Sequence, residues 1–310
     1  MDREDDPQSY HHHFIQVNGV KLHYVEEGTG PNVLWYGWRY QIRYLAKKGY
    51  RVIVPDMRGY GQSESPRFME GDMSVYSWKT KAKDISDMMS QLHIPSAVLI
   101  GHDWGSHWAQ RVAKWYPDKV KALVLISVPY SAPMRFKMSL RQIVDKLPNF
   151  KYQITFAEDK KFEETVNADP RPFFTCLFRY ARDSVPMDFE GEIPKLKRSE
   201  MVSQQALDYY VEQYKKATFY GSLACYKLTS QSYEEEKNLP RSIETPIMMI
   251  TTGHDQALPP MMAQEMPKTC KHLTMKHIED AAHWVMVERP KEINQLLSEF
   301  IPQFFSKAKL

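Results

Sequence analysis

The sequence has 310 residues, 43% of them hydrophobic, so it can bury one large core, and an α/β domain with an inserted subdomain suits this length better than two independent domains. Lysine and arginine number 41 against 38 aspartates and glutamates, which gives no reason to expect nucleic acid or an anionic membrane as the main partner. No apolar stretch approaches the ~20 residues of a spanning helix, and residues 1–9 are acidic and polar rather than signal-like. We therefore expect a cytoplasmic protein without a membrane span.

Predicted strands and helices alternate along most of the chain. Residues 13–17 and 20–25 flank Asn18-Gly19, a pair typical of a tight hairpin turn. Further strands are predicted at 32–35, 51–54, 96–100, 122–127, 247–251 and 273–277, and helices at 42–48, 79–92 and 108–116. This alternation predicts an α/β fold with a mainly parallel central sheet flanked by helices.

The pattern changes between residues 131 and 240, where helices and loops rich in proline, methionine and aromatic residues are predicted. We interpret this segment as a helical lid, or cap, inserted into a core domain made of residues 1–130 and 241–310.

The segment 101–106, Gly-His-Asp-Trp-Gly-Ser, directly follows the apolar run 96–100. Its two glycines allow a sharp turn from strand to helix that presents the middle side chain above the sheet edge. A carboxylate that attacks a saturated carbon forms an ester that water can cleave, whereas a serine would leave a stable ether. The pattern therefore predicts Asp103 as a nucleophile for an sp3 carbon.

Two further residues complete this chemistry. Asp255 follows the predicted strand 247–251, and His283 follows the last predicted strand. A histidine can activate water for ester cleavage, and an acid can hold its tautomer. The chain order of nucleophile, acid and histidine is that of the α/β hydrolases, with Asp103 in place of serine.

On these residues, and on segments 38–42, 49–63 and 282–284, the chain resembles the α/β-hydrolase-fold epoxide hydrolases over nearly its full length. The resemblance implies the α/β-hydrolase fold and conversion of a small apolar epoxide and water to a vicinal diol through an aspartyl ester, with no cofactor or metal. It also implies that Tyr152 and Tyr226, in the lid, donate hydrogen bonds to the epoxide oxygen. A phenol is protonated at neutral pH yet acidic enough to stabilise the developing alkoxide.

The sequence departs from this family at the oxyanion site. The amide of Trp104 is expected to be one oxyanion donor and its indole to line the pocket. The family's His-Gly-x-Pro segment, which supplies the second donor, is missing from residues 32–40, where about eight residues are lacking by comparison. Either residues 36–38 keep their place at the helix start and shorten the strand, or residues 33–36 complete the strand and the amide of Trp38 replaces the lost donor. Since losing one donor costs ~10²- to 10³-fold, we expect slow ester hydrolysis.

Two alternatives remain open at this point. A haloalkane dehalogenase-like hydrolase uses the same aspartate chemistry, although two lid phenols suit an oxygen leaving group better than a halide. A noncatalytic ligand-binding protein on this fold is compatible with the missing segment. The oligomeric state is open between monomer and homodimer.

Other residues with chemical potential have simpler interpretations. His102 and His254 are expected to be structural, and residues 11–13, three histidines in a row, an exposed strand start rather than a metal site. The three cysteines at 176, 225 and 270 are too widely spaced for a ligand pair and predict reduced thiols.

Overall fold

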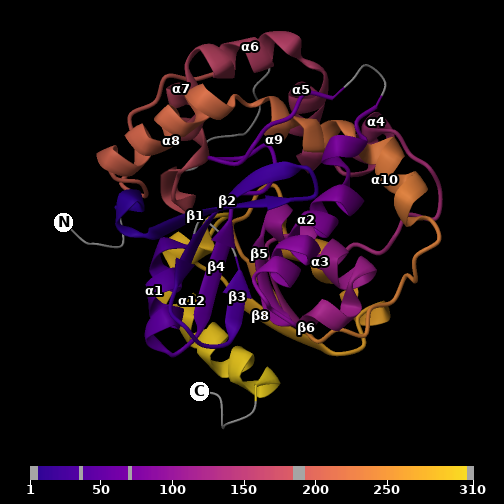
Figure 1. Cartoon of the computed structure of the whole chain (residues 1–310). Helices are drawn as coiled ribbons and strands as arrows, with labels where there is room; N and C mark the ends of the chain where they lie inside the picture. Colours follow the sequence, from indigo (N-terminus) through magenta and orange to yellow (C-terminus); the bar gives the residue numbers. More distant parts are fainter. Residues whose placement is uncertain (1–5, 35–37, 69–71, 184–192, 306–310) are drawn as a thin grey trace.

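The computed structural model describes residues 6–34, 38–68, 72–183 and 193–305. Within these ranges eight strands form one sheet in the order β1-β2-β4-β3-β5-β6-β7-β8 (Figure 1). The strands are β1 His11–Val17, β2 Val20–Glu27, β3 Asn32–Leu34, β4 Arg51–Pro55, β5 Ala97–His102, β6 Val120–Ile126, β7 Ile247–Thr252 and β8 Leu273–Ile278. The helices of the core are α1 Arg39–Lys47, α2 Trp78–Gln91, α3 Trp104–Trp115, α11 Val285–Glu288 and α12 Pro290–Phe300.

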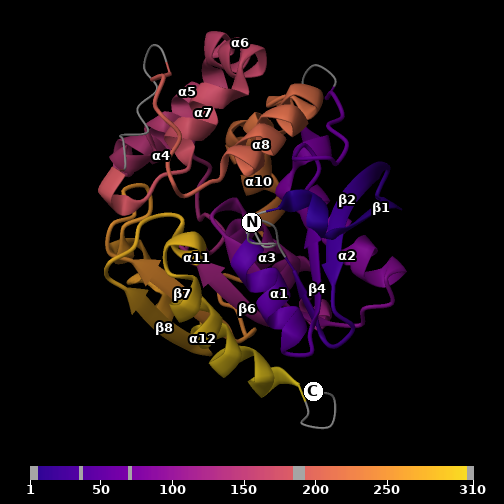
Figure 2. The same ribbon diagram turned by 90° about the vertical axis from the view of Figure 1, so that its left-hand side faces the viewer.

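Among the described strands, β1 pairs with β2 and β2 pairs with β4 in antiparallel fashion, and all neighbours in the order β4-β3-β5-β6-β7-β8 are parallel. Side chains of β6 alternate between two buried layers: Val124 packs in the layer that contains α1 and α12, and Leu123 in the layer that contains α2 and α3. These helix pairs cover opposite faces of the sheet (Figure 2). The predicted mainly parallel sheet with helices on both faces is confirmed.

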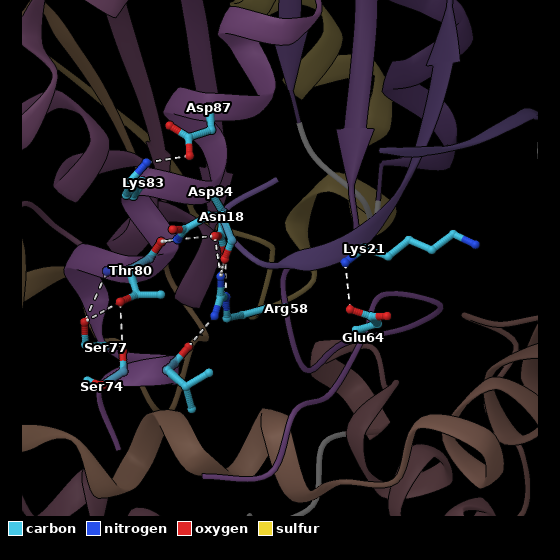
Figure 3. Close-up of polar contacts among 11 residues, drawn as sticks. Asn18, Lys21, Arg58, Glu64, Ser74, Ser77, Thr80, Lys83, Asp84 and Asp87 are labelled. Atoms are coloured by element: carbon cyan, nitrogen blue, oxygen red, sulfur yellow. Dashed lines mark hydrogen bonds and ion pairs between the residues drawn. The ribbon is translucent and has the colours of Figure 1, made fainter. Parts of the chain in front are cut away.

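The hairpin turn is anchored by a buried ion pair (Figure 3). Asn18 has φ 45°, as expected for this turn, and its Nδ2 donates to Asp84 Oδ1 at 2.8 Å. Arg58, in the loop after β4, donates to both oxygens of Asp84 at 2.6 Å and to the carbonyl of Asn18 at 3.1 Å. Because both charged partners are buried, this bidentate pair holds the hairpin and the loop after β4 against α2.

The segment between β6 and β7 contains seven α-helices among its described residues and forms a layer at one end of the sheet (Figures 1 and 2). They are α4 Leu140–Lys146, α5 Tyr152–Glu158, α6 Lys160–Ala168, α7 Pro170–Leu177, α8 Gln204–Ala217, α9 Tyr220–Ala224 and α10 Thr229–Glu236. A buried pair ties this lid to the core, since Arg111 of α3 donates to both carboxylate oxygens of Glu236 at 2.7 and 2.8 Å.

The strand β3 is short. It pairs with β4 over three residues and with β5 over two, Val33 opposite Val98 and Leu34 opposite Leu99. Residues 35–37, which carry most of the question about the missing segment, lie outside the described residues. The next helix begins at Arg39, three residues earlier than predicted.

None of the helices in the described ranges has both the length and the apolar character needed to cross a bilayer.

Candidate active site

The turn from β5 to α3 has the geometry that the sequence predicted. Asp103 lies between the two elements with φ 52° and ψ −125°, a conformation that costs energy for any residue with a side chain. Strand and helix approach so closely that a Cβ on Gly101 would lie 2.4 Å from the carbonyl carbon of Gly105. The Asp103 amide donates to the carbonyl of Ile126 at 3.2 Å, which fixes the turn to β6.

The three residues of the predicted constellation meet at the carboxyl ends of the strands. His283 Nδ1 lies 2.8 Å from Asp255 Oδ2, and His283 Nε2 lies 3.6 Å from Asp103 Oδ2. The other oxygen of Asp255 accepts from the amides of Ala257 and Leu258 at 3.1 and 3.0 Å. Asp255 is thereby held in place and orients the ring so that Nε2 faces Asp103.

The charges of this group are strongly coupled. Burial raises the pKa of Asp255, but the attraction of His283 and its hydrogen bonds prevail and lower it to about 2. Burial lowers the pKa of His283, but the charges of Asp255 and Asp103 prevail and raise it to about 9. Burial raises the pKa of Asp103, against the charge of His283 and the amide of Trp104. With a pKa of about 9, His283 is mostly a cation at neutral pH in the free protein, with Asp255 on one side of its ring and Asp103 on the other.

Two lid phenols, Tyr152 and Tyr226, line the same cavity as Asp103. Tyr152 begins α5, and Tyr226 lies in the 3-10 helix η6 Cys225–Lys227, with ring centroids 6.3 Å apart. Burial, together with the charge of Asp103, raises the pKa of both phenols, so each is a proton donor at neutral pH. The Tyr226 ring stands edge-on to Trp104, with centroids 5.2 Å apart.

The cavity has a volume of about 320 Å³ and contains Asp103, His283 and both tyrosines in its wall. The rest of the wall is mostly aromatic, and the lid contributes Phe156, Phe173, Phe174, Phe178, Tyr210, Tyr214 and Phe219. Such a wall suits an apolar ligand with few polar groups.

A contact between two glycines brings Tyr226 to this position. Gly221 in α9 packs on Gly59 of the loop after β4, and a Cβ on Gly221 would lie 2.4 Å from the Gly59 Cα. Only a residue without a side chain fits at either position, and Gly59 also has φ 84°. Sequence reasoning missed this pair, because each glycine alone is a common loop or helix residue and 162 positions separate them.

The remaining predicted residues fall into different places. Trp104 lines the cavity, and its amide hydrogen-bonds the Asp103 carboxylate. Trp38 precedes α1 with a side chain 3% exposed in the core, outside the cavity wall, so its role as a replacement donor stays a prediction. His102 is buried and its Nε2 lies 2.7 Å from the carbonyl oxygen of His283. His254 is exposed at the cavity edge.

The N-terminal histidines lie on the edge strand β1, whereas Cys176 lies in the cavity wall and Cys225 precedes Tyr226, close enough to Asp103 for that charge to contribute to its raised pKa. His12 Nδ1 lies 2.8 Å from His23 Nε2, and His11 lies 3.2 Å from Glu27. The three cysteines are free and buried. Among the described residues no group of histidine, cysteine and acidic side chains is arranged to hold a metal ion.

This fold and its aspartate, acid and histidine are those of an α/β hydrolase. The family model for the alpha/beta hydrolase fold matches residues 28–290. Epoxide hydrolase srdG of Neurospora crassa is 33% identical over 96% of this chain and 97% of its own length. The chain therefore belongs to the epoxide hydrolases of the α/β-hydrolase fold.

Other relatives agree. Bifunctional epoxide hydrolase 2 of Mus musculus is 32% identical over 96% of this chain, which spans only 56% of that relative's length. A solved mutant of the Vigna radiata epoxide hydrolase superposes with a TM-score of 0.83 at 25% identity, over 95% of this chain and 99% of that one.

Proposed function

We propose that this protein hydrolyses small apolar epoxides to vicinal diols, with Asp103 as nucleophile, His283 as base and Asp255 as its orienting acid. One observation carries the proposal: a carboxylate in a strained turn lies 3.6 Å from a histidine and lines, together with two phenols, a cavity that is mostly apolar. Water is the only cosubstrate this chemistry requires.

In the first step, Asp103 attacks a ring carbon of the epoxide and forms an alkyl ester while the C–O bond breaks. The oxygen that leaves carries developing negative charge, and hydrogen bonds from Tyr152 and Tyr226 stabilise it; one of them transfers its proton. General-acid assistance of this kind contributes about 10²- to 10⁴-fold. Two phenols favour this leaving group over a halide.

In the second step, His283 takes a proton from water, and the hydroxide attacks the ester carbonyl of Asp103. The tetrahedral intermediate collapses to the Asp103 carboxylate and the diol. Of the two protons of the water, one ends on the leaving oxygen of the diol and the other restores the tyrosine that lost its proton in the first step. The base must be neutral, yet in the free protein the pKa of His283 is about 9. Esterification removes the negative charge of Asp103, which is one of the carboxylate charges that stabilise the imidazolium. Ester formation therefore lowers the pKa of His283 and favours the neutral base at the step that needs it.

Oxyanion stabilisation in the second step rests on the amide of Trp104, which already hydrogen-bonds the Asp103 carboxylate. The second donor of the family would come from residues 35–37 or from Trp38. We propose that ester hydrolysis limits turnover and that the alkyl-enzyme accumulates.

Incubation with styrene oxide tests this function. We expect diol in the wild type and an adduct on Asp103 by intact mass and peptide mapping, and neither with Asp103→Ala. In ¹⁸O-labelled water, a single turnover should place the label in Asp103 rather than in the diol, because water attacks the ester carbonyl. Label found first in the diol would contradict an aspartyl ester, and no diol with no adduct would favour a noncatalytic binder.

The cap and core boundaries at 131 and 240 follow from the lid helices between β6 and β7 and are part of the same proposal. A cytoplasmic location and a monomeric or homodimeric state stay predictions.

A further inference from the structure

The loop that carries His283 is held by a carboxylate outside the three residues already discussed. Glu288 ends α11, and its two oxygens accept from two backbone amides. Oε1 accepts from Ala282, the residue before His283, at 3.1 Å, and Oε2 accepts from Ala181 at 3.2 Å. Ala181 lies in the lid, four residues after the end of α7.

Two further hydrogen bonds hold the loop that carries His283. The carbonyl oxygen of His283 lies 2.7 Å from His102 Nε2, and the Trp284 indole donates to the carbonyl of Leu177 in α7 at 2.7 Å. The histidine loop is therefore joined to the lid through Glu288 and Trp284, and its backbone is restrained on both sides of His283.

The charges near His283 also depend on the residues that hold this loop. His283 lies beside the carboxyl groups of Asp255 and Asp103. The negative charges of these groups and of Glu288 raise the pKa of His283, while burial lowers the pKa of the neighbouring His102. Burial raises the pKa of Glu288, against hydrogen bonds from Ala181 and Ala282 and the charges of Arg289 and His283.

We infer that Glu288 is a positioning residue for the base of the hydrolytic step: it sets the place of His283 relative to the ester and couples that place to the lid. The inference rests on the proposed function. Nothing else described in the protein joins the amide before His283 to the lid through one side chain. Alkylation, which uses Asp103 and the lid phenols, should depend little on Glu288.

Glu288→Gln tests the inference because it removes the charge and leaves one oxygen to accept where two were present. Glu292→Gln is the matched control, since Glu292 lies in the first turn of α12 with its side chain 55% exposed. Glu288→Asp keeps the charge but shortens the reach. Two quantities are measured for each variant: the NMR titration midpoint of His283, and the rates of ester formation and ester decay with styrene oxide as a function of pH.

In Glu288→Gln we expect the His283 midpoint, and the pH midpoint of ester decay, to fall by about 0.5 pH unit. The limiting rate of decay at high pH should fall about tenfold or more, because a displaced base is a poorer base. Ester formation should stay within about twofold of wild type. Glu288→Asp should lower the limiting decay rate with an unchanged midpoint, and Glu292→Gln should change nothing.

An unshifted His283 midpoint in Glu288→Gln, or equal losses in ester formation and decay, would overturn the inference. If Glu288→Gln does not fold, Glu288→Asp decides: a normal decay rate would then refute positioning, and a slow decay with normal ester formation would support it. If the wild type forms neither ester nor diol while the His283 midpoint still shifts, the proposed function fails and the coupling of Glu288 to His283 stands.

Discussion

Replacing Asp103 by asparagine mimics the ester in one respect, because it removes the negative charge that faces His283 with little change in shape. The structure places that charge 3.6 Å from His283 Nε2. Two unit charges at this separation attract by about 1 kcal/mol in water and by about 5 kcal/mol at the effective dielectric constant of ~20 that suits protein sites. Asp103→Asn should therefore weaken proton binding by His283 between about sixfold and several thousandfold.

The assay is an NMR titration of the His283 ring in ¹³C-histidine-labelled protein, with His283→Gln to assign the signal. The wild-type midpoint is expected at about 9, and Asp103→Asn should move it clearly downward. Asp280→Asn, an exposed carboxylate three residues before His283, is the control and should leave the midpoint unchanged. Intact mass during the titration verifies that residue 103 is still asparagine.

An unchanged midpoint in Asp103→Asn would refute the reasoning, because it would mean that the nucleophile and the base do not interact. The raised pKa of His283 also determines how the stability of the fold changes with pH. Since the folded protein binds this proton more tightly than the ordinary histidine value of 6.5, the His283 charge stabilises the fold below pH 6.5, and that stabilisation is lost as the pH rises through about 9.

Three further outcomes follow from other parts of the structure. Gly221→Ala places a Cβ 2.4 Å from Gly59, so we expect a loss of about 1 to 3 kcal/mol in the free energy of unfolding and, through displaced Tyr226, a slower ester formation in stopped-flow assays. Tyr226→Phe should slow ester formation about 10²-fold or more while leaving ester decay within severalfold of wild type in the same assay. Lys81 is fully buried, and its ammonium lies 4.2 Å from the centroid of the Trp108 ring; burial lowers its pKa from 10.5 to about 8, a shift that costs about 3 kcal/mol at pH 7. Lys81→Met should therefore raise the free energy of unfolding by up to about 3 kcal/mol at pH 7 in denaturant titrations, and this gain should vanish as the pH rises from 8 to above 10.5.

The fold was predictable because its signals are local. Apolar runs bounded by turn residues located every strand of the core, and the motif at 101–106 located the turn that presents Asp103, since a strand, a tight turn and a helix are all encoded within a few residues. The observed helix boundaries differ from the predicted ones by a few residues. For example, α3 begins at Trp104, whereas the predicted helix begins at residue 108.

The site was predictable only in part. Asp103, Asp255 and His283 could be found because each follows a strand end, and strand ends of a parallel sheet gather at one edge. Tyr152 and Tyr226 came from family resemblance alone, since nothing local distinguishes them from other lid tyrosines. A hydrogen bond between a side chain and a distant backbone group, such as that from the Ala181 amide to Glu288 Oε2, leaves no periodic pattern in a single sequence.

In the mechanism that we propose, the order of the two chemical steps follows from where the charges lie. While Asp103 is ionised it is a nucleophile, and the same charge keeps His283 protonated and unable to activate water. Once Asp103 is esterified it can no longer attack, and the loss of its charge releases His283 to act as a base. One carboxylate thereby controls both reactivities, so water is activated only when an ester is present to be cleaved. The oxyanion site then decides how long that ester persists, and this is the step at which the short connection between β3 and α1 would affect turnover.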